Sequence, residues 1–352
     1  MKKYSLAERY GMTRSRLSII TEDARTTKNI PIGERLSLLR RGFSNRQYVL
    51  YDLKNKNMDD YLSEYERRKT RFINGQASYV LSNKLVFSQI VEQHIRTAKI
   101  YGMIQKGDIW PVDSTRNVAD YNTLVNYLDE SRPLILKPNS GTDGGRGVML
   151  ICMENGKVFC NQTELDLSSL KSLLESLDGY LVCEFVRQGN YGNYLFAESV
   201  NTIRILTMMC PQEHEPFIAM SIQRIGTDAS KPVDNWSAGG VSAHINADTG
   251  TLSKAVSFRD GIVEWHKTHP DTGIEIEGII VPNWQRIKEA VISLAATFPY
   301  LPYVAWDVVP MDEGLLIIEG NNCSDVEMLQ VHEPLLKNER VREFYKYYNI
   351  IK

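Results

Sequence analysis

The feature that most constrains this chain is a glycine-rich stretch between two runs of strand-forming residues, LILKPNSGTDGGRGVMLI at residues 134–151. Four glycines fall within seven positions, beside a lysine and an arginine. Bare backbone next to fixed positive charge is typical of a loop that holds a phosphate chain. The common phosphate-loop signatures open a helix, whereas residues 148–151 continue as a strand. The stretch therefore predicts a glycine-rich hairpin, with Lys137 on the strand that enters it.

The bulk composition argues against several classes of protein. A chain of 352 residues can bury more than one core, so two or three subdomains are expected. The net charge of −2 argues against a nucleic-acid or anionic-membrane binder, although it does not exclude a local basic patch. No apolar run is long enough for a membrane span, and the N-terminus turns polar too early for a secretory signal. The five cysteines show no CxxC spacing, so we interpret them as reduced thiols of a cytoplasmic protein.

The spacing of apolar residues predicts an α+β chain. The first eighty or so residues have a charged, helical pattern, and a further helix is expected from residue 84 with its apolar face reaching residue 98. An Asn-Gly turn at 155–156 should close a hairpin, and an amphipathic helix is expected from Trp284 to Phe298. The lid region should contain strands at 134–138, 147–153 and 180–186 and a helix at 165–177. A largely antiparallel sheet should form from the strands 202–210, 216–224, 241–247, 303–310 and 314–320.

A second constellation lies in YVAWDVVPMDEGLLIIEGNN, residues 303–322. Asp307 lies inside the first strand-like run, and Glu319 and Asn321 end the second, two residues apart and so on one side of the strand. Oxygen ligands on adjacent antiparallel strands suit Mg²⁺. A buried carboxylate needs a partner, and a metal ion would supply one for Asp307. The alternative is a solvated hairpin with polar ends.

Two arginines lie within apolar strands, Arg204 in NTIRI and Arg224 in SIQRI. A buried guanidinium usually has an anion to match. This anion could be a phosphate, a substrate carboxylate, a tetrahedral intermediate or the carboxylate of a structural salt bridge. Asn201, next to Arg204, belongs to the same candidate site.

Taken together, these stretches resemble the ATP-grasp superfamily, in which ATP lies between two α+β subdomains under a glycine-rich lid hairpin. The superfamily resemblance rests on KLVFSQI around Lys84, LILKPNSGTDGGRGV, LVCEF and the Asp307…Glu-x-Asn ending. The motifs SVNTIRILTM, VDNWSAGGVSAHINADTGTL, HPDTG and AWDVVP…LLIIEGNN resemble more narrowly its sugar-transfer-associated branch. The implied division is a helical N-terminal region at 1–80, an N-terminal ATP-grasp part at 81–132, the lid at 133–190 and a C-terminal subdomain with the metal site at 191–352.

The resemblance also implies roles for individual residues. Mg²⁺ would be held by Asp307, Glu319 and Asn321, while Arg204 and Arg224 would be catalytic. ATP would be bound by Lys84, Lys137, Ser140, Gly141, Gly144, Gly145, Arg146 and Gly147, with Glu184 at the adenine hinge. Substrate would be bound by Asn201, Asp234, Asn235, Gly239, Gly240 and His269. Glycines and an Asx turn also explain residues 234–240 without function.

The function that the resemblance implies is ATP-dependent carboxylate–amine ligation through an acyl phosphate with release of ADP. The branch suggests that an amino acid is attached to a sugar or sugar acid in surface polysaccharide biosynthesis, so the partners are small carboxylates and amines. Peptide-ligase members carry an arginine two residues before the metal-binding aspartate, where this chain has Ala305. That difference keeps open a kinase that phosphorylates a hydroxyl. A third alternative is a non-catalytic nucleotide-sensing or DNA-binding protein that uses the helices of residues 1–45.

Overall fold

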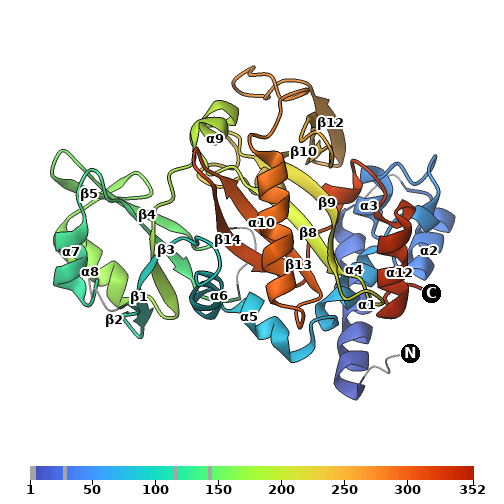
Figure 1. The fold of residues 1–352 in the computed structure, drawn as a ribbon, viewed down its shortest axis with the longest axis horizontal. Helices are drawn as coiled ribbons and strands as arrows, with labels where there is room; N and C mark the ends of the chain where they lie inside the picture. The colour runs from blue at the N-terminus through green and yellow to red at the C-terminus, as the bar shows by residue number, and fades with distance from the viewer. Residues whose placement is uncertain (1–4, 27–29, 114–117, 142–144) are drawn as a thin grey trace. The chain divides into compact units, whose positions relative to one another are not determined.

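A computed structural model describes residues 5–26, 30–113, 118–141 and 145–352 (Figure 1). The chain divides into two compact units. The first comprises residues 1–78, 188–315 and 320–352, and the second comprises residues 79–187 and 316–319. The first unit therefore combines the N-terminal helices with most of the C-terminal half of the chain. The four-part division expected from the sequence stays a prediction.

The larger unit is built on a seven-stranded sheet in the order β12-β11-β10-β9-β8-β13-β14. Its strands are β8 (Ile203–Met209), β9 (Pro216–Ile225), β10 (Val241–Ile245), β11 (Leu252–Arg259), β12 (Ile262–His266), β13 (Tyr303–Pro310) and β14 (Leu315–Asn321). The pairs from β12 to β13 are antiparallel, which agrees with the largely antiparallel sheet expected here. Figure 1 shows α10 (Trp284–Thr297) across the sheet, where it packs on β8, β9 and β13. Its apolar stripe of Trp284, Ile287, Val291 and Leu294 is buried, which confirms that predicted helix.

The N-terminal helices share a core with this sheet. They are α1 (Leu6–Thr26), α2 (Ile32–Arg41), α3 (Asn45–Leu50) and α4 (Glu64–Lys69), while all of α5 (Ser78–Ser82) except Ser78 belongs to the smaller unit. Ser44 and Ser63 start α3 and α4 with capping boxes, in which the serine accepts from the third residue's amide and that residue's side chain accepts in return. Leu38, Tyr51 and Leu62 join a core that also holds sheet residues and the C-terminal helix α12 (Glu339–Tyr347). Residues between Ile30 and Ile73 thus contribute to the core of this unit. The remaining helices here are α9 (Asn190–Leu195) and α11 (Glu327–Gln330).

The smaller unit contains a second seven-stranded sheet, in the order β2-β1-β7-β3-β4-β5-β6. Its strands are β1 (Ile100–Gln105), β2 (Asp108–Pro111), β3 (Leu134–Pro138), β4 (Met149–Glu154), β5 (Lys157–Cys160), β6 (Thr163–Leu165) and β7 (Tyr180–Glu184), and its helices are α6 (Lys84–Val91), α7 (Tyr121–Tyr127) and α8 (Leu167–Glu175). The antiparallel β3–β4 pair confirms the predicted hairpin. Asn155 and Gly156 both have positive φ, as a type I′ turn requires.

Several boundaries differ from the prediction. The helix that starts at Lys84 ends at Val91, so Ala98 is buried outside it. Asp166 caps α8 through the amide of Ser169, which starts that helix later than expected. The pairs β1–β2 and β11–β12 were not predicted. Nothing in the described part of the chain forms a helix with the length and apolar character of a membrane span.

Candidate active site

The centre of the larger unit is a buried ion pair between neighbouring strands. Asp307 on β13 stands directly opposite Arg204 on β8 in the antiparallel register. Arg204 donates to Asp307 through Nε and also through Nη2, the latter at 3.0 Å. Asp307 is 3% exposed and Arg204 is 6% exposed. Because the pair is desolvated, each charge depends on the other for compensation.

A second arginine completes the cluster. Arg224 on β9 donates through Nη1 to Asp307 Oδ2 at 3.1 Å and through Nη2 to Asp234 Oδ1 at 2.7 Å. Asp234 also accepts from the amide of Thr202 at 2.8 Å. Arg204, Asp307, Arg224 and Asp234 therefore form a buried row of alternating charge, which we call the arginine–aspartate cluster. The anion expected for the buried Arg204 is Asp307 itself.

The cluster revises the argument for a metal at Asp307, because two arginines already supply the partner that its carboxylate needs. Asp307 and Asn321 belong to the larger unit, whereas Glu319 belongs to the smaller unit. Asn321 donates Nδ2 to Ala305 O at 3.3 Å. No three His, Cys, Asp or Glu side chains gather as a metal site anywhere in the described ranges. The predicted ligands are two carboxylates and one amide, all hard oxygen donors that suit Mg²⁺, so the metal site stays a prediction.

Asn201 and His269 lie in a structural network of the larger unit. Asn201 is fully buried and donates to the carbonyls of Gly192 and Phe196 at 2.9 and 2.7 Å. His269 stacks on Phe196, with ring centroids 5.0 Å apart, and its Nε2 lies 2.7 Å from Gly226 O. Both residues hold α9 and its flanking loops in place. Their predicted role in substrate binding stays a prediction.

The turn at 234–240 has a structural reason for its composition. The side chain of Asn235 accepts from the amide of Ser237 at 3.2 Å. Gly239 has a φ of 110°, which favours glycine. A Cβ at Gly240 would stand 2.9 Å from Asp234 O and 3.0 Å from Ile225 O. These contacts account for the Asx residue and both glycines, and a substrate role is not needed to explain them.

In the smaller unit, the start of α6 is fastened to the end of β3. Asn139 is buried and accepts from the amide of Lys84 through its backbone oxygen and from the amide of Leu85 through Oδ1, both at 3.0 Å. The amide of Asn139 in turn donates to Gly179 O at 2.8 Å. This anchor brings the first residue of α6 to the strand that carries Lys137. The two predicted phosphate-binding lysines therefore lie in one region.

Cys183 lies on β7, the strand that pairs with the strand of Lys137. Burial raises the pKa of the Cys183 thiol, and the charges of Lys137 and Lys84 oppose the rise. In the register of β3 and β7, Cys183 faces Ile135 and Leu181 faces Lys137, so these side chains share one face of the sheet. Lys137 is half-buried there and forms no ion pair within the described ranges. A half-buried cation without an internal counter-ion is available to an external anion.

The backbone of the glycine loop also suits the binding of an anion beside Lys137. Gly141, Gly145 and Gly147 have φ values of 79°, 75° and 76°, a region that favours glycine. A Cβ at Gly147 would stand 2.8 Å from the hydroxyl of Tyr180. Ser140 and Arg146 are exposed, and Gly144 lies outside the described residues. The loop thus presents a bare backbone beside Pro138 and the lysines.

Glu184 closes β7 and has local partners. Its carboxylate accepts from the amide of Lys99 at 3.0 Å and from Arg96 Nη2 at 3.1 Å. The residue therefore fixes the chain that leads into β1. Binding of adenine or ribose by Glu184 stays a prediction.

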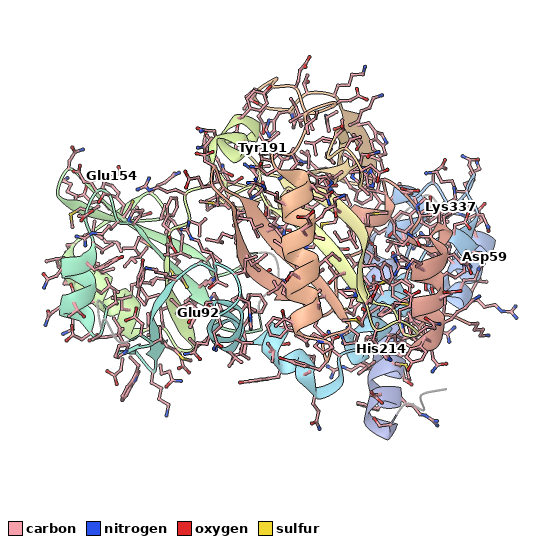
Figure 2. All side chains as sticks on the ribbon, viewed as in Figure 1. Asp59, Glu92, Glu154, Tyr191, His214 and Lys337 are labelled. Atoms are coloured by element: carbon pink, nitrogen blue, oxygen red, sulfur yellow. The ribbon has the colours of Figure 1, made fainter. Side chains whose placement is uncertain are left out.

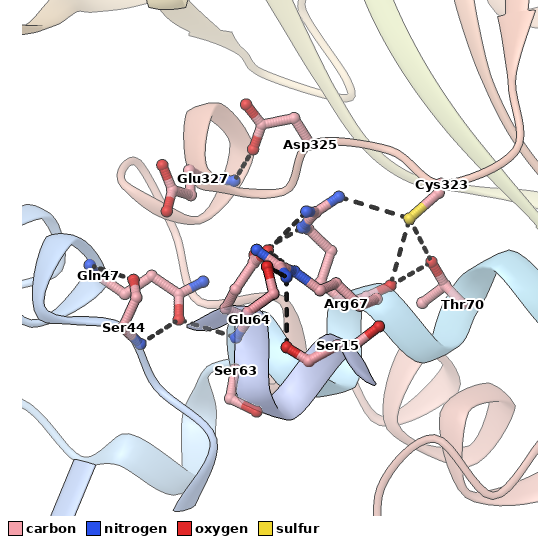
Figure 3. A network of polar contacts seen from close by, with 12 residues as sticks. Ser15, Ser44, Gln47, Ser63, Glu64, Arg67, Thr70, Cys323, Asp325 and Glu327 are labelled. Carbon is pink, nitrogen blue, oxygen red and sulfur yellow. Dashed lines mark hydrogen bonds and ion pairs between the residues drawn. The ribbon is translucent and has the colours of Figure 1, made fainter. Parts of the chain in front are cut away.

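Sequence reasoning missed a polar network in the N-terminal helices (Figure 3). Glu64 on α4 accepts from Arg67 through both carboxylate oxygens, at 2.6 and 2.7 Å, and also from Arg68. Arg67 Nη1 lies 3.4 Å from the sulfur of Cys323, two residues beyond β14. Asn74 donates to Asn322 Oδ1 at 2.7 Å. The N-terminal helices thus hold the segment that follows the predicted metal ligands, and the Ser-x-x-Glu capping box at 63–66 was the available signal.

Glu327 is the most strongly perturbed carboxyl of this network. Burial raises the pKa of Glu327 to about 7, with a further rise from the charge of Asp325, while Arg46 lowers it. Arg46 Nε contacts Glu327 Oε2 at 2.6 Å and its guanidinium stacks over Phe258 at 4.3 Å. The hydroxyl of Tyr191, which is labelled in Figure 2, donates to Gln223 Oε1 at 3.0 Å. Gln223 directly precedes Arg224 of the arginine–aspartate cluster in the sequence. Polar side chains in this unit are thus mostly committed to internal partners.

The two seven-stranded sheets and the glycine hairpin agree with the ATP-grasp fold expected from the sequence. The sequence model of the sugar-transfer associated ATP-grasp family matches residues 64–343, and the chain belongs to this family. A search of curated proteins finds no match.

Three of the solved structures to which this chain is similar are the following. A D-alanine–D-alanine ligase from Bacillus anthracis complexed with ATP shares 14% identity, with 98% of this chain and 95% of that chain covered and a TM-score of 0.39. The D-alanine–D-alanine ligase from Coxiella burnetii shares 11%, with coverage of 78% and 59% and a TM-score of 0.40. The biotin carboxylase domain of a Hydrogenobacter thermophilus 2-oxoglutarate carboxylase in complex with MgADP shares 11%, with coverage of 77% and 46% and a TM-score of 0.42. The chain thus spans about half of that carboxylase domain's length.

Proposed function

We propose that this protein is an ATP-dependent carboxylate–amine ligase that forms an amide through an acyl phosphate and releases ADP. Its substrates would be an amino acid and a sugar or sugar acid destined for a surface polysaccharide. The observation that carries the proposal is Lys137, a half-buried lysine beside a glycine loop, with no internal counter-ion among the described residues. Membership of the sugar-transfer associated ATP-grasp family supports the class of reaction.

In this proposal the smaller unit's residues bind the nucleotide. The ammonium groups of Lys137 and Lys84 would contact phosphate oxygens, and the amides of the glycine loop would approach the same chain because no Cβ stands in the way. Exclusion of water by the loop would protect the acyl phosphate from hydrolysis. The role of these residues is to orient the phosphates.

Mg²⁺ would be held by Asp307, Glu319 and Asn321, whose oxygens match its preference for hard ligands. When bound, the ion supplies neutralisation of charge on the transferring phosphoryl group. Arg204 and Arg224 would orient the carboxylate of Asp307, since both donate to it. A guanidinium of this pair would also stabilise the oxyanion formed when the amine attacks, in place of the arginine absent at Ala305.

A second candidate is a kinase that transfers the phosphoryl group to a hydroxyl and stops there. The observation that favours it is Ala305, which is fully buried and offers no charge at the position where ligase relatives carry an arginine. Both reactions would use the same nucleotide site.

The test is to incubate the protein with ATP and Mg²⁺ and a panel of amino acids, uronic acids and amino sugars, with mass spectrometry of the products. ADP, free phosphate and a new amide mass, all lost in Glu319→Ala, would support the ligase. ADP with a phosphorylated acceptor and no free phosphate would identify the kinase. Nucleotide binding without turnover on any panel member would contradict both reactions and favour a nucleotide sensor.

A further inference from the structure

The charge of this chain is unevenly distributed. Residues 1–41 contain ten Lys and Arg against four Asp and Glu, a net charge of +6, although the whole chain carries −2. The family match starts at residue 64, so α1 and α2 lie outside it. A weakly acidic protein therefore carries a strongly basic N-terminal region that lies outside the family match.

Three large apolar side chains are exposed on one side of α1. Tyr10, Leu17 and Ile20 are 73%, 59% and 45% exposed, and their spacing of seven and three residues places them on one side of the helix. The inner side is fixed, because Ile19 is buried and Arg68 donates to Ser15 O at 3.3 Å. The apolar side is therefore presented outward by the packing. We call Tyr10, Leu17 and Ile20 the outer strip.

Arginines flank this strip on both sides. At about 100° per residue, Arg14 lies on one side of the strip and Arg9 and Arg16 lie on the other. Arg9 and Arg14 are exposed, and Arg16 donates to Arg40 O at 3.3 Å, which brings α2 against α1. Two further aliphatic side chains on α2, Ile32 and Leu36, are exposed one helical turn apart. The surface of α1 and α2 thus combines exposed aliphatic groups with basic groups.

We propose that the outer strip and its arginines dock on an anionic lipid surface. Aliphatic and aromatic side chains would enter the boundary between headgroups and acyl chains, and the arginines would contact lipid phosphates. Charge complementarity favours this occupant over a second copy of the chain, because two copies would bring +6 against +6. The apolar side chains of the outer strip disfavour nucleic acid as the partner, because a phosphate backbone is bound by basic and polar groups. An anionic lipid surface is complementary to both the apolar side chains and the arginines.

The experiment is co-sedimentation of the full chain with vesicles of phosphatidylcholine, with and without phosphatidylserine. We expect binding to the anionic vesicles that weakens as salt is added. Substitution of both Leu17→Gln and Ile20→Gln should lower the vesicle affinity about tenfold. Substitution of both Arg9→Glu and Arg14→Glu should lower it by at least about tenfold.

Matched controls separate this surface from exposure or charge in general. Ile262→Gln with Ile280→Gln removes two equally exposed isoleucines, and Lys254→Glu with Lys337→Glu reverses two exposed lysines elsewhere. Both controls should bind vesicles as the unaltered protein does, and all variants should keep its circular dichroism and melting temperature. Equal losses in controls and test variants would overturn the proposal. So would binding to duplex DNA without vesicle binding, self-association lost in Leu17→Gln with Ile20→Gln, or no binding to anionic vesicles.

Discussion

The two units place their cations in opposite circumstances. In the larger unit, Arg204 and Arg224 are buried and compensated by Asp307 and Asp234. In the smaller unit, Lys137 is half-buried and has no carboxylate partner within the described ranges. A compensated cluster holds a geometry but has little net charge to offer, whereas an uncompensated lysine gains most from an incoming anion. The comparison separates residues that shape the site from residues that should bind the nucleotide.

The largest expected effect is the loss of stability on removing Asp307 from the arginine–aspartate cluster. Asp307→Ala leaves two arginines facing each other without their shared carboxylate, which should cost about 3–5 kcal/mol of unfolding free energy. Urea unfolding followed by circular dichroism measures it. Asp248→Ala, at an exposed position on the same unit, should cost less than about 0.5 kcal/mol. An Asp307→Ala protein as stable as the control would mean that the arginines do not depend on this carboxylate.

Lys137→Ala, in contrast, should weaken nucleotide binding rather than stability. It should lower ATP affinity about 10- to 100-fold, since a charge-assisted contact with phosphate is lost, and it should leave stability nearly unchanged. Isothermal titration with ATP and a thermal melt measure the two quantities. Lys157→Ala, whose side chain pairs with Glu164 on the same unit, is the matched control and should bind ATP normally. Equal affinities for both variants would remove Lys137 from the nucleotide site.

Glu327 is a buried carboxylate like Asp307, but only Arg46 forms an ion pair with it among the described residues, whereas two arginines pair with Asp307. Its pKa is raised to about 7 by burial, so the folded state holds the proton more tightly than the unfolded state. The stability from this group is present below the unfolded pKa of about 4.3 and is lost as pH rises through about 7. The unfolding free energy of the protein, relative to Glu327→Gln, should fall by about 3 kcal/mol between these limits. Denaturant titrations at a series of pH values test this, and a constant difference would refute it.

The smallest effect concerns the glycine loop. Gly147→Ala should destabilise the protein by about 1–2 kcal/mol, because positive φ is strained and its Cβ would meet the Tyr180 hydroxyl. Gly141→Ala has the same φ strain but no atom of the described residues within 4 Å of the new Cβ, so its cost should be smaller. Thermal melts of the two variants decide this. If Gly141→Ala proved the more costly, steric contact at Gly147 would not be the cause.

The sequence by itself determined the elements that depend on local pattern. The glycine hairpin, the Asn-Gly turn and the helix from Trp284 follow from turn chemistry and periodicity, which act over a few residues. It also indicated that Arg204 and Asp307 would be buried, because each interrupts an apolar strand. The family resemblance, confirmed over residues 64–343, came from motifs spread along the chain.

Only the tertiary structure decided which charges meet. Asp307 pairs with Arg204 because the antiparallel register of β8 and β13 sets them opposite, and a register shift of one residue would separate them. The contact of Arg67 with Cys323 joins positions 256 residues apart. No local sequence pattern predicts a contact between residues so far apart in the chain, because the contact forms only when the helices and the sheet bury a common core. Sequence therefore specified the chemical groups, and packing decided which of them neutralise one another and which are left for a ligand.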